Sequence, residues 1–109
     1  MPIFISQGRY TPDAIKGMVA KPEDREPAIR QLWEKAGGKL LAFYMTFGEY
    51  DWLVIAEGEQ ENVTAALVAA AAGGSITDIK TITAMTPSDM KNAFAKAGPL
   101  AASFKSAGK

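Results

Sequence analysis

The sequence predicts a single α+β domain in which helices cover one face of a four-stranded antiparallel sheet. Four short apolar segments rich in β-branched and aromatic residues predict the strands. Two longer segments between them carry apolar residues at helical spacing. The length of 109 residues, with 48% hydrophobic and 22% charged residues, suits one globular domain.

The first half of the chain predicts a strand, a helical segment and a second strand. Residues 2–10 alternate loosely between apolar and polar side chains, which favours a strand. Residues 11–13, Thr-Pro-Asp, are typical of a helix start, because they combine a hydroxyl cap, a first-turn proline and an acid. Pro22 disfavours helical backbone at the residue before it, so we expect the helix to kink or restart there. Residues 37–38, Gly-Gly, end it.

The second half predicts a hairpin, a helix and a fourth strand. Its strands are residues 39–47, 51–57 and 76–85, and its helix is residues 59–72. A short further helix begins at Thr86 and is predicted to end at Gly98 and Pro99, followed by a frayed tail. We therefore divide the chain into a domain of residues 1–86 and a C-terminal helix and tail of residues 87–109.

The predicted order, β-α-β-β-α-β, is that of a ferredoxin-like sandwich with an extra C-terminal helix. Right-handed crossovers place both crossover helices on one face of the sheet, and the other face of a monomer should then be polar. Strict alternation instead gives apolar residues on both faces of the hairpin strands. One parity holds Leu41, Phe43, Met45, Leu53 and Ile55, and the other holds Leu40, Ala42, Tyr44, Trp52 and Val54.

The second apolar face predicts self-association. Leaving four large apolar side chains in water forgoes about 6–12 kcal/mol, comparable with the stability of a whole domain. We therefore expect a homodimer, or a ring of dimers, that packs sheet against sheet as a dimeric α/β barrel.

Composition excludes several kinds of chemistry. The chain has no cysteine and no histidine, which excludes disulfides, thiolate nucleophiles, Cys/His zinc sites, Ser-His-Asp relays and haem held by either residue. Glu49 and Asp51 are too few ligands for a metal site, so we expect no metal and no cofactor. Twelve basic and twelve acidic residues predict no nucleic-acid and no membrane partner. The N-terminus does not resemble a signal peptide and no segment suits a membrane span, so a cytoplasmic protein is expected.

The hairpin holds the most distinctive residues of the chain. Two interpretations of them are open: a plain hairpin, in which Asp51 bonds local amides and the aromatic side chains anchor an interface, or a shallow pocket for a small ligand. The candidate ligand-binding residues are Tyr44, Gly48, Tyr50, Asp51 and Trp52.

This hairpin also resembles a known family. Gly48-Glu49-Tyr50-Asp51 is similar to the Gly-Tyr-Asp signature of the GYD domain family, with Glu49 placed between the glycine and the tyrosine. The similarity extends over residues 1–86, through the first three strands and the Ala-rich helix at residues 63–72. It implies a ferredoxin-like fold of the dimeric α/β-barrel kind, found mostly in bacteria and archaea. It implies no reaction, and it gives Gly48, Tyr50 and Asp51 no assigned role.

Three functions are compatible with these observations. The favoured one is a non-catalytic homo-oligomer that binds a small apolar or aromatic ligand or serves as a scaffold, because no acid–base pair stands out. The first alternative is a cofactor-free enzyme, a monooxygenase or isomerase acting on an activated aromatic or quinol. Its apolar pocket would take polar residues from Tyr44, Tyr50, Asp51 and Trp52, with Asp51 and Tyr50 as candidates for acid–base work. The second alternative is a regulatory subunit that binds a partner through residues 23–26 or the C-terminal helix.

Overall fold

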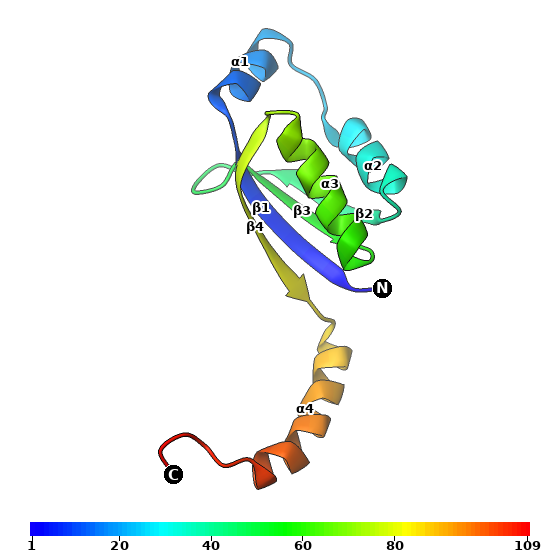
Figure 1. Cartoon of the computed structure of the whole chain (residues 1–109). Coiled ribbons are helices and arrows are strands. Elements are labelled where there is room, and N and C mark those ends of the chain that lie inside the picture. The colour runs from blue at the N-terminus through cyan, green and yellow to red at the C-terminus, as the bar shows by residue number, and fades with distance from the viewer.

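The computed structural model describes all 109 residues and confirms the α+β class (Figure 1). In chain order the elements are β1 (Ile3–Tyr10), α1 (Pro12–Ala20), α2 (Glu26–Lys35), β2 (Lys39–Met45), β3 (Trp52–Glu57), α3 (Gln60–Ala72), β4 (Ile76–Ala84) and α4 (Pro87–Ser103). Of the two outcomes predicted at Pro22, a kink or a restart, the structure shows the restart: α1 ends at Ala20 and α2 begins at Glu26.

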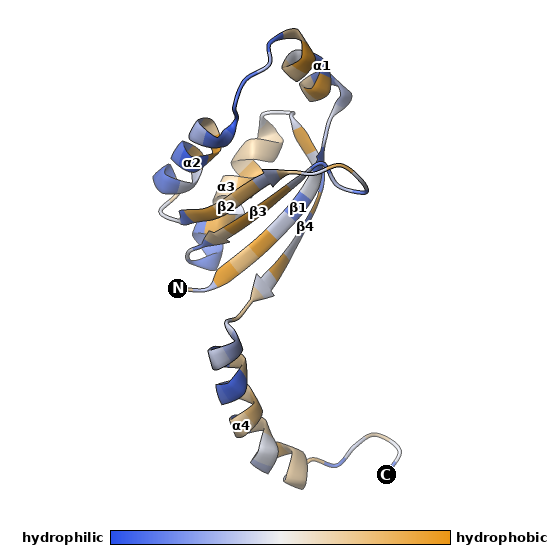
Figure 2. Cartoon of the chain, turned by 180° about the vertical axis from the view of Figure 1, so that it is seen from behind, coloured by the Kyte–Doolittle hydropathy of each residue, from blue (hydrophilic) through white to orange (hydrophobic).

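All four strands form one antiparallel sheet in the order β2-β3-β1-β4. Both α2 and α3 lie on one face of this sheet, and α1 lies beyond its end (Figure 1). Seen from behind, the sheet has no helix in front of it (Figure 2). We call this uncovered side the open face.

Local chemistry explains where the helices begin. The hydroxyl of Thr11 accepts a hydrogen bond from the Ala14 amide at 3.2 Å, which caps α1. The hydroxyl of Thr86 does the same for the Asp89 amide at 3.1 Å, which caps α4. Both helices then start with proline, whose missing N–H is not needed in the first turn.

The core lies between the sheet and the pair α2 and α3. Its eight buried apolar residues come from all of these elements except β4. They are Phe4, Trp33, Leu40, Trp52, Val54, Ala56, Val63 and Ala66. The buried polar residue Ser6 is satisfied, since its hydroxyl lies 2.9 Å from that of Thr81.

A register shift in β2 makes the predicted division of the hairpin into two parity sets wrong. Leu40 pairs with Ala56, but Ala42 pairs with Ile55, so Leu41 is an extra residue in the strand. After this bulge every side chain of β2 changes face relative to strict alternation. Phe43 therefore joins Leu40 on the helix side.

The C-terminal helix is longer than the sequence predicted, and the predicted end at Gly98 and Pro99 is wrong. Instead α4 runs for 17 residues through Pro99 to Ser103. The proline removes one backbone hydrogen bond, yet its fixed φ is helical and the exposed carbonyl that loses its partner can bond to water. Further along, the Ser103 hydroxyl lies 3.3 Å from the Pro99 and Leu100 carbonyl oxygens.

This helix projects away from the domain and does not cover the sheet (Figure 1). The radius of gyration is 18.1 Å, whereas a compact chain of this length has about 13 Å. The isolated chain is therefore not compact.

Candidate functional site

The hairpin residues of the Gly-Tyr-Asp signature bind the end of β1. The Asp51 carboxylate accepts a hydrogen bond from the Tyr10 amide at 2.8 Å, and the Asp51 amide donates to the Gly8 carbonyl at 2.8 Å. The Thr46 hydroxyl donates to the Tyr50 carbonyl at 2.7 Å, which closes the loop between β2 and β3. Asp51 thus fixes the backbone of Tyr10, at the point where β1 passes beyond the start of β3.

The structure does not bring the five candidate ligand-binding residues together. Tyr44 lies on the open face and is 63% exposed, and Gly48 lies in an exposed loop. Tyr50 and Asp51 are half-buried beside β1. Trp52 is buried under the helices, with only 3% of its surface exposed. Among the five, Trp52 lines the main cavity of the molecule.

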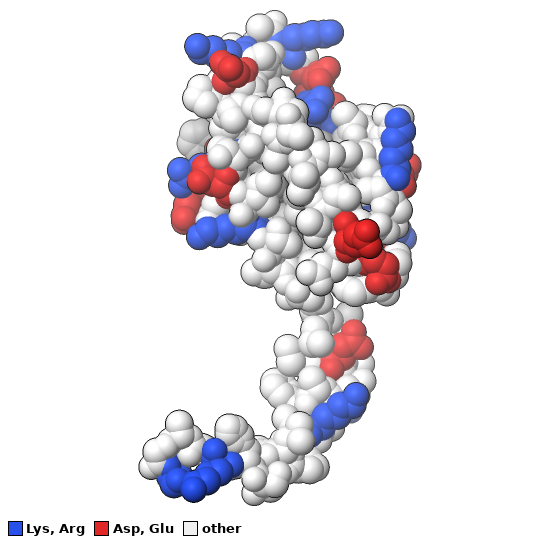
Figure 3. Space-filling model, in the orientation of Figure 1, with Lys and Arg blue, Asp and Glu red and all other residues white.

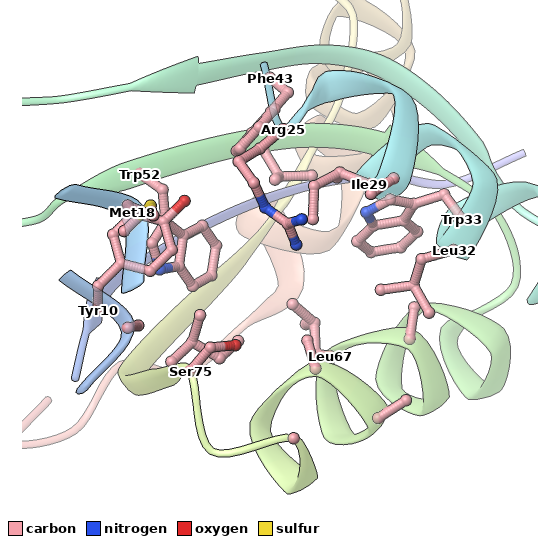
Figure 4. Close-up of a pocket in the computed structure, with 18 of the residues that line it drawn as sticks. Tyr10, Met18, Arg25, Ile29, Leu32, Trp33, Phe43, Trp52, Leu67 and Ser75 are labelled. Carbon is pink, nitrogen blue, oxygen red and sulfur yellow. The ribbon is translucent and has the colours of Figure 1, made fainter. Parts of the chain in front are cut away.

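That cavity lies on the helix side of the sheet and has a volume of about 500 Å³ (Figure 4). Its walls come from α1, α2, α3, the linker between α1 and α2, and all four strands. Most of the lining side chains are apolar, and four are aromatic. The aromatic ones are Tyr10, Trp33, Phe43 and Trp52.

A few polar groups lie among these apolar walls. The linker between α1 and α2 contributes Lys21, Glu23 and Arg25, and the segment before β4 contributes Ser75. Figure 4 shows the Arg25 guanidinium reaching into the cavity between the indole rings of Trp52 and Trp33. One guanidinium nitrogen of Arg25 lies 3.0 Å from the Glu23 carboxylate.

The Tyr10 hydroxyl stays protonated in this setting. Burial raises the pKa of Tyr10 above its ordinary value; the Arg25 charge opposes this rise and the Asp51 carboxylate adds to it. The hydroxyl donates to the Met45 sulfur at 3.1 Å, a weak acceptor that a better one would displace. Tyr10 therefore offers a neutral hydrogen-bond donor at the cavity.

The indole N–H of Trp52 is buried and has no hydrogen-bond partner. Leaving a buried donor unpaired costs about 1–3 kcal/mol, so native structures keep few of them. The ring of Trp52 lines the cavity, but the N–H itself is enclosed by protein atoms and does not face the cavity.

Sequence reasoning missed the main features of this cavity. It singled out neither Tyr10 nor Arg25: Tyr10 was treated as part of the first strand, and Arg25 lies within the acidic segment 23–26. The available signal was Pro22, which separates α1 from α2 and leaves the linker to cross the end of the cavity. The acidic segment 23–26 was interpreted as a docking surface, yet Glu23 and Arg25 both line the cavity.

The structure contains no group of three acidic, cysteine or histidine side chains that could hold a metal ion. None of its helices has the length and apolarity needed to cross a bilayer. On the face in Figure 3, acidic and basic side chains are scattered, and the surface over α3 is largely uncharged. No large patch of one sign is visible on that face.

The fold and the cavity define the class: a small ferredoxin-like protein with an apolar cavity between its helices and its sheet. The profile of the GYD domain family matches residues 4–94, so the chain belongs to the GYD domain family. This confirms the resemblance carried by residues 48–51. No curated protein shows a significant match to the chain.

Two solved structures share the fold. The protein TTHA0845 from Thermus thermophilus has a TM-score of 0.50 and 12% identity, covering 79% of this chain and 95% of its own. The transcriptional regulator NMB0573 from Neisseria meningitidis, solved as a complex with L-Met, has a TM-score of 0.52 and 11% identity over 79% of this chain. Only 51% of that regulator is covered, so this chain spans about half its length. At these identities the likeness shows the fold alone.

Proposed function

We propose that this GYD domain is a homo-oligomeric binding module that holds a small apolar or aromatic molecule between its helices and its sheet. The observation that carries the proposal is the cavity of about 500 Å³. Small-molecule sites typically measure about 300–1,000 Å³ and combine apolar walls with a few polar groups. This cavity has that size and that composition.

Binding is favoured over catalysis by the position of Asp51. The enzyme alternative gave the acid–base role to Asp51 and Tyr50, but neither residue lines the cavity. The Asp51 carboxylate is also occupied by the Tyr10 amide. The regulator NMB0573, which contains a similar fold, was solved as a complex with the amino acid L-Met. This precedent supports small-molecule binding more than it supports any reaction.

The proposed oligomer is supported by the pattern of the open face. A row of apolar side chains crosses all four strands in register. Its members are Ala42, Ile55, Ile5 and Ile82. The neighbouring row adds Tyr44 and Leu53 before it turns polar at Gln7 and Lys80. An apolar centre with a polar edge is typical of an interface.

Surface area supports the same proposal. The chain exposes 7776 Å², about 2,000 Å² more than the roughly 5,800 Å² expected for a compact monomer of its mass. A standard interface buries about 800 Å² on each partner. The excess is enough for the open face and α4 both to be covered by another copy.

The C-terminal helix contributes to this excess. Met90, Phe94 and Leu100 lie on one side of α4 and are exposed, Phe94 by 69%. Because α4 does not reach its own sheet (Figure 2), we propose that this side packs against a second copy of the chain.

The experiment is native mass spectrometry on protein purified without denaturation, compared with two tryptophan variants in α3. Ala70 lines the cavity and Ala72, at the end of the same helix, does not. We expect a multimer that carries extra non-protein mass in the wild type and in Ala72→Trp, and a multimer without that mass in Ala70→Trp. A wild-type monomer would contradict the oligomer, and extra mass retained by Ala70→Trp would contradict the cavity as the site.

A further inference from the structure

We propose that the ligand of the cavity is an aromatic monocarboxylate whose carboxylate is bound by Arg25. This inference rests on the proposed function and specifies the chemical class of the ligand. Three observations carry it: the free donors of Arg25, the balance of charge around the cavity, and the aromatic walls.

Most N–H groups of the Arg25 guanidinium make no hydrogen bond in the structure. It carries five N–H groups in a planar fork that matches a carboxylate, and its side chain makes one hydrogen bond in the structure, to Glu23. Arg25 immediately precedes α2, and its side chain extends inward from the linker, between the two indole rings (Figure 4). The unused donors are therefore presented to the cavity.

The charges around the cavity favour an anion. Its charged lining residues are Lys21, Glu23 and Arg25, which sum to one positive charge. Glu23 is already paired with Arg25, and neither aspartate nor a second glutamate lines the cavity. Tyr10, which also lines the cavity, adds a neutral donor. A group rich in acceptors, such as a carboxylate, satisfies this set better than an amine or an alcohol.

The aromatic residues that line the cavity indicate the chemical nature of the rest of the ligand. The rings of Tyr10, Trp33, Phe43 and Trp52 come from four different elements and surround one space. Aromatic rings pack favourably edge-to-face or offset against one another, so an aromatic group fits these walls better than a sugar or a peptide backbone. A single carboxylate suffices, because the cavity offers one guanidinium.

The experiment uses 4-phenylbutanoate and its neutral analogue 4-phenylbutanamide as probes of the full-length chain. The chain has two tryptophans and both line the cavity, so intrinsic tryptophan fluorescence reports occupancy without a label. We expect the acid to bind about tenfold or more tightly than the amide, since a hydrogen bond to a charged group is far stronger than one between neutral groups.

Three variants assign this preference to Arg25. Arg25→Gln should abolish the preference for the acid while the amide still binds. Glu23→Gln should strengthen acid binding several-fold, because it frees the guanidinium from its partner. Arg30→Gln removes the same charge from α2, but Arg30 pairs with Glu26 outside the cavity, so it should leave both affinities unchanged.

The outcomes separate this inference from the proposed function. If acid and amide bind the wild type equally, the carboxylate is not recognised and the inference is overturned, while the binding module stands. If neither probe binds and native mass spectrometry shows no bound mass, both fail. Circular dichroism checks that Arg25→Gln folds; should it not fold, the wild-type comparison of acid with amide and the gain in Glu23→Gln still decide the matter.

Discussion

Asp51 supplies the carboxylate of the family signature, and in this chain that carboxylate accepts a hydrogen bond from a backbone amide. It accepts from the Tyr10 amide and donates its own amide to Gly8, so it binds the hairpin loop to β1 through two contacts. Tyr10 in turn lines the cavity. We therefore assign Asp51 a positioning role: it holds the strand end from which the Tyr10 ring projects.

The first prediction compares two substitutions of Asp51. Asp51→Ala leaves the half-buried Tyr10 amide without an acceptor and should lower the free energy of unfolding by about 1–3 kcal/mol. Asp51→Asn keeps an oxygen acceptor and should cost about 1 kcal/mol or less. Urea denaturation of both variants measures the difference. Equal and negligible losses would argue against the positioning role.

The second prediction concerns Gly8, which lies beneath the indole ring of Trp52. A Cβ at Gly8 would overlap Trp52 Cζ2 and lie 2.8 Å from Cε2, with the Thr77 carbonyl oxygen 3.1 Å away. Because Trp52 is buried and cannot move away into solvent, Gly8→Ala should destabilise the fold by about 1–3 kcal/mol and shift the tryptophan emission.

The matched control is Gly48→Ala, in the loop between β2 and β3 that precedes Trp52. A Cβ at Gly48 meets nothing within 4 Å, so this variant should stay within about 0.5 kcal/mol of the wild type. If Gly8→Ala caused no greater loss of stability than Gly48→Ala, the close packing of Trp52 on β1 would be refuted.

At the scale of elements, the order of strands and helices could be predicted from the sequence, and their relative placement could not. Periodicity gave the four strands, and Pro22 gave the break between α1 and α2. The break alone does not say that α1 lies beyond the end of the sheet, where its residues Ala14, Gly17 and Met18 line the cavity. The bulge at Leu41 has no local signal, because only the pairing with β3 reveals it.

The C-terminal helix shows that glycine and proline in a sequence do not always mark the end of a helix. Gly98 and Pro99 predicted an end, but capping at Thr86 and the small, exposed residues around the proline carry the helix past it. A proline ends a helix when the freed carbonyl cannot find another partner, and on an exposed helix water supplies one.

The third prediction tests this helix directly. Proline is about 3 kcal/mol less favourable than alanine inside a helix and glycine about 1 kcal/mol. Pro99→Ala should therefore slow amide hydrogen exchange in residues 95–103 strongly, and Gly98→Ala should slow it less. If α4 ended at Gly98, neither change would protect the residues that follow.

At the scale of the whole molecule, the isolated chain is unusual because it leaves two apolar surfaces in water. One is the central row of the open face and the other is the apolar side of α4. The sequence predicted an apolar second face, although it assigned several hairpin residues to the wrong side. The prediction held at this scale because a hairpin apolar on both sides stays so wherever the bulge lies.

The fourth prediction places a charge in the central row. Ile82 is 61% exposed in the isolated chain and pairs with Ile5, so Ile82→Lys should be tolerated by the monomer and should disrupt an open-face interface. Light scattering should show a multimer for the wild type and a monomer for the variant. Val19→Lys, a change at an apolar residue of α1 that is 75% exposed, should leave the mass unchanged; dissociation by both variants, or by neither, would point to another interface.

The most direct test of the binding module is an experimental structure of the protein purified without denaturation. We predict copies packed open face to open face, with electron density for a small molecule between α2, α3 and the sheet, in contact with Trp52 and Arg25. Copies whose cavities are closed by an inward movement of α1 and α2, with nothing bound between Trp52 and Trp33, would contradict the module.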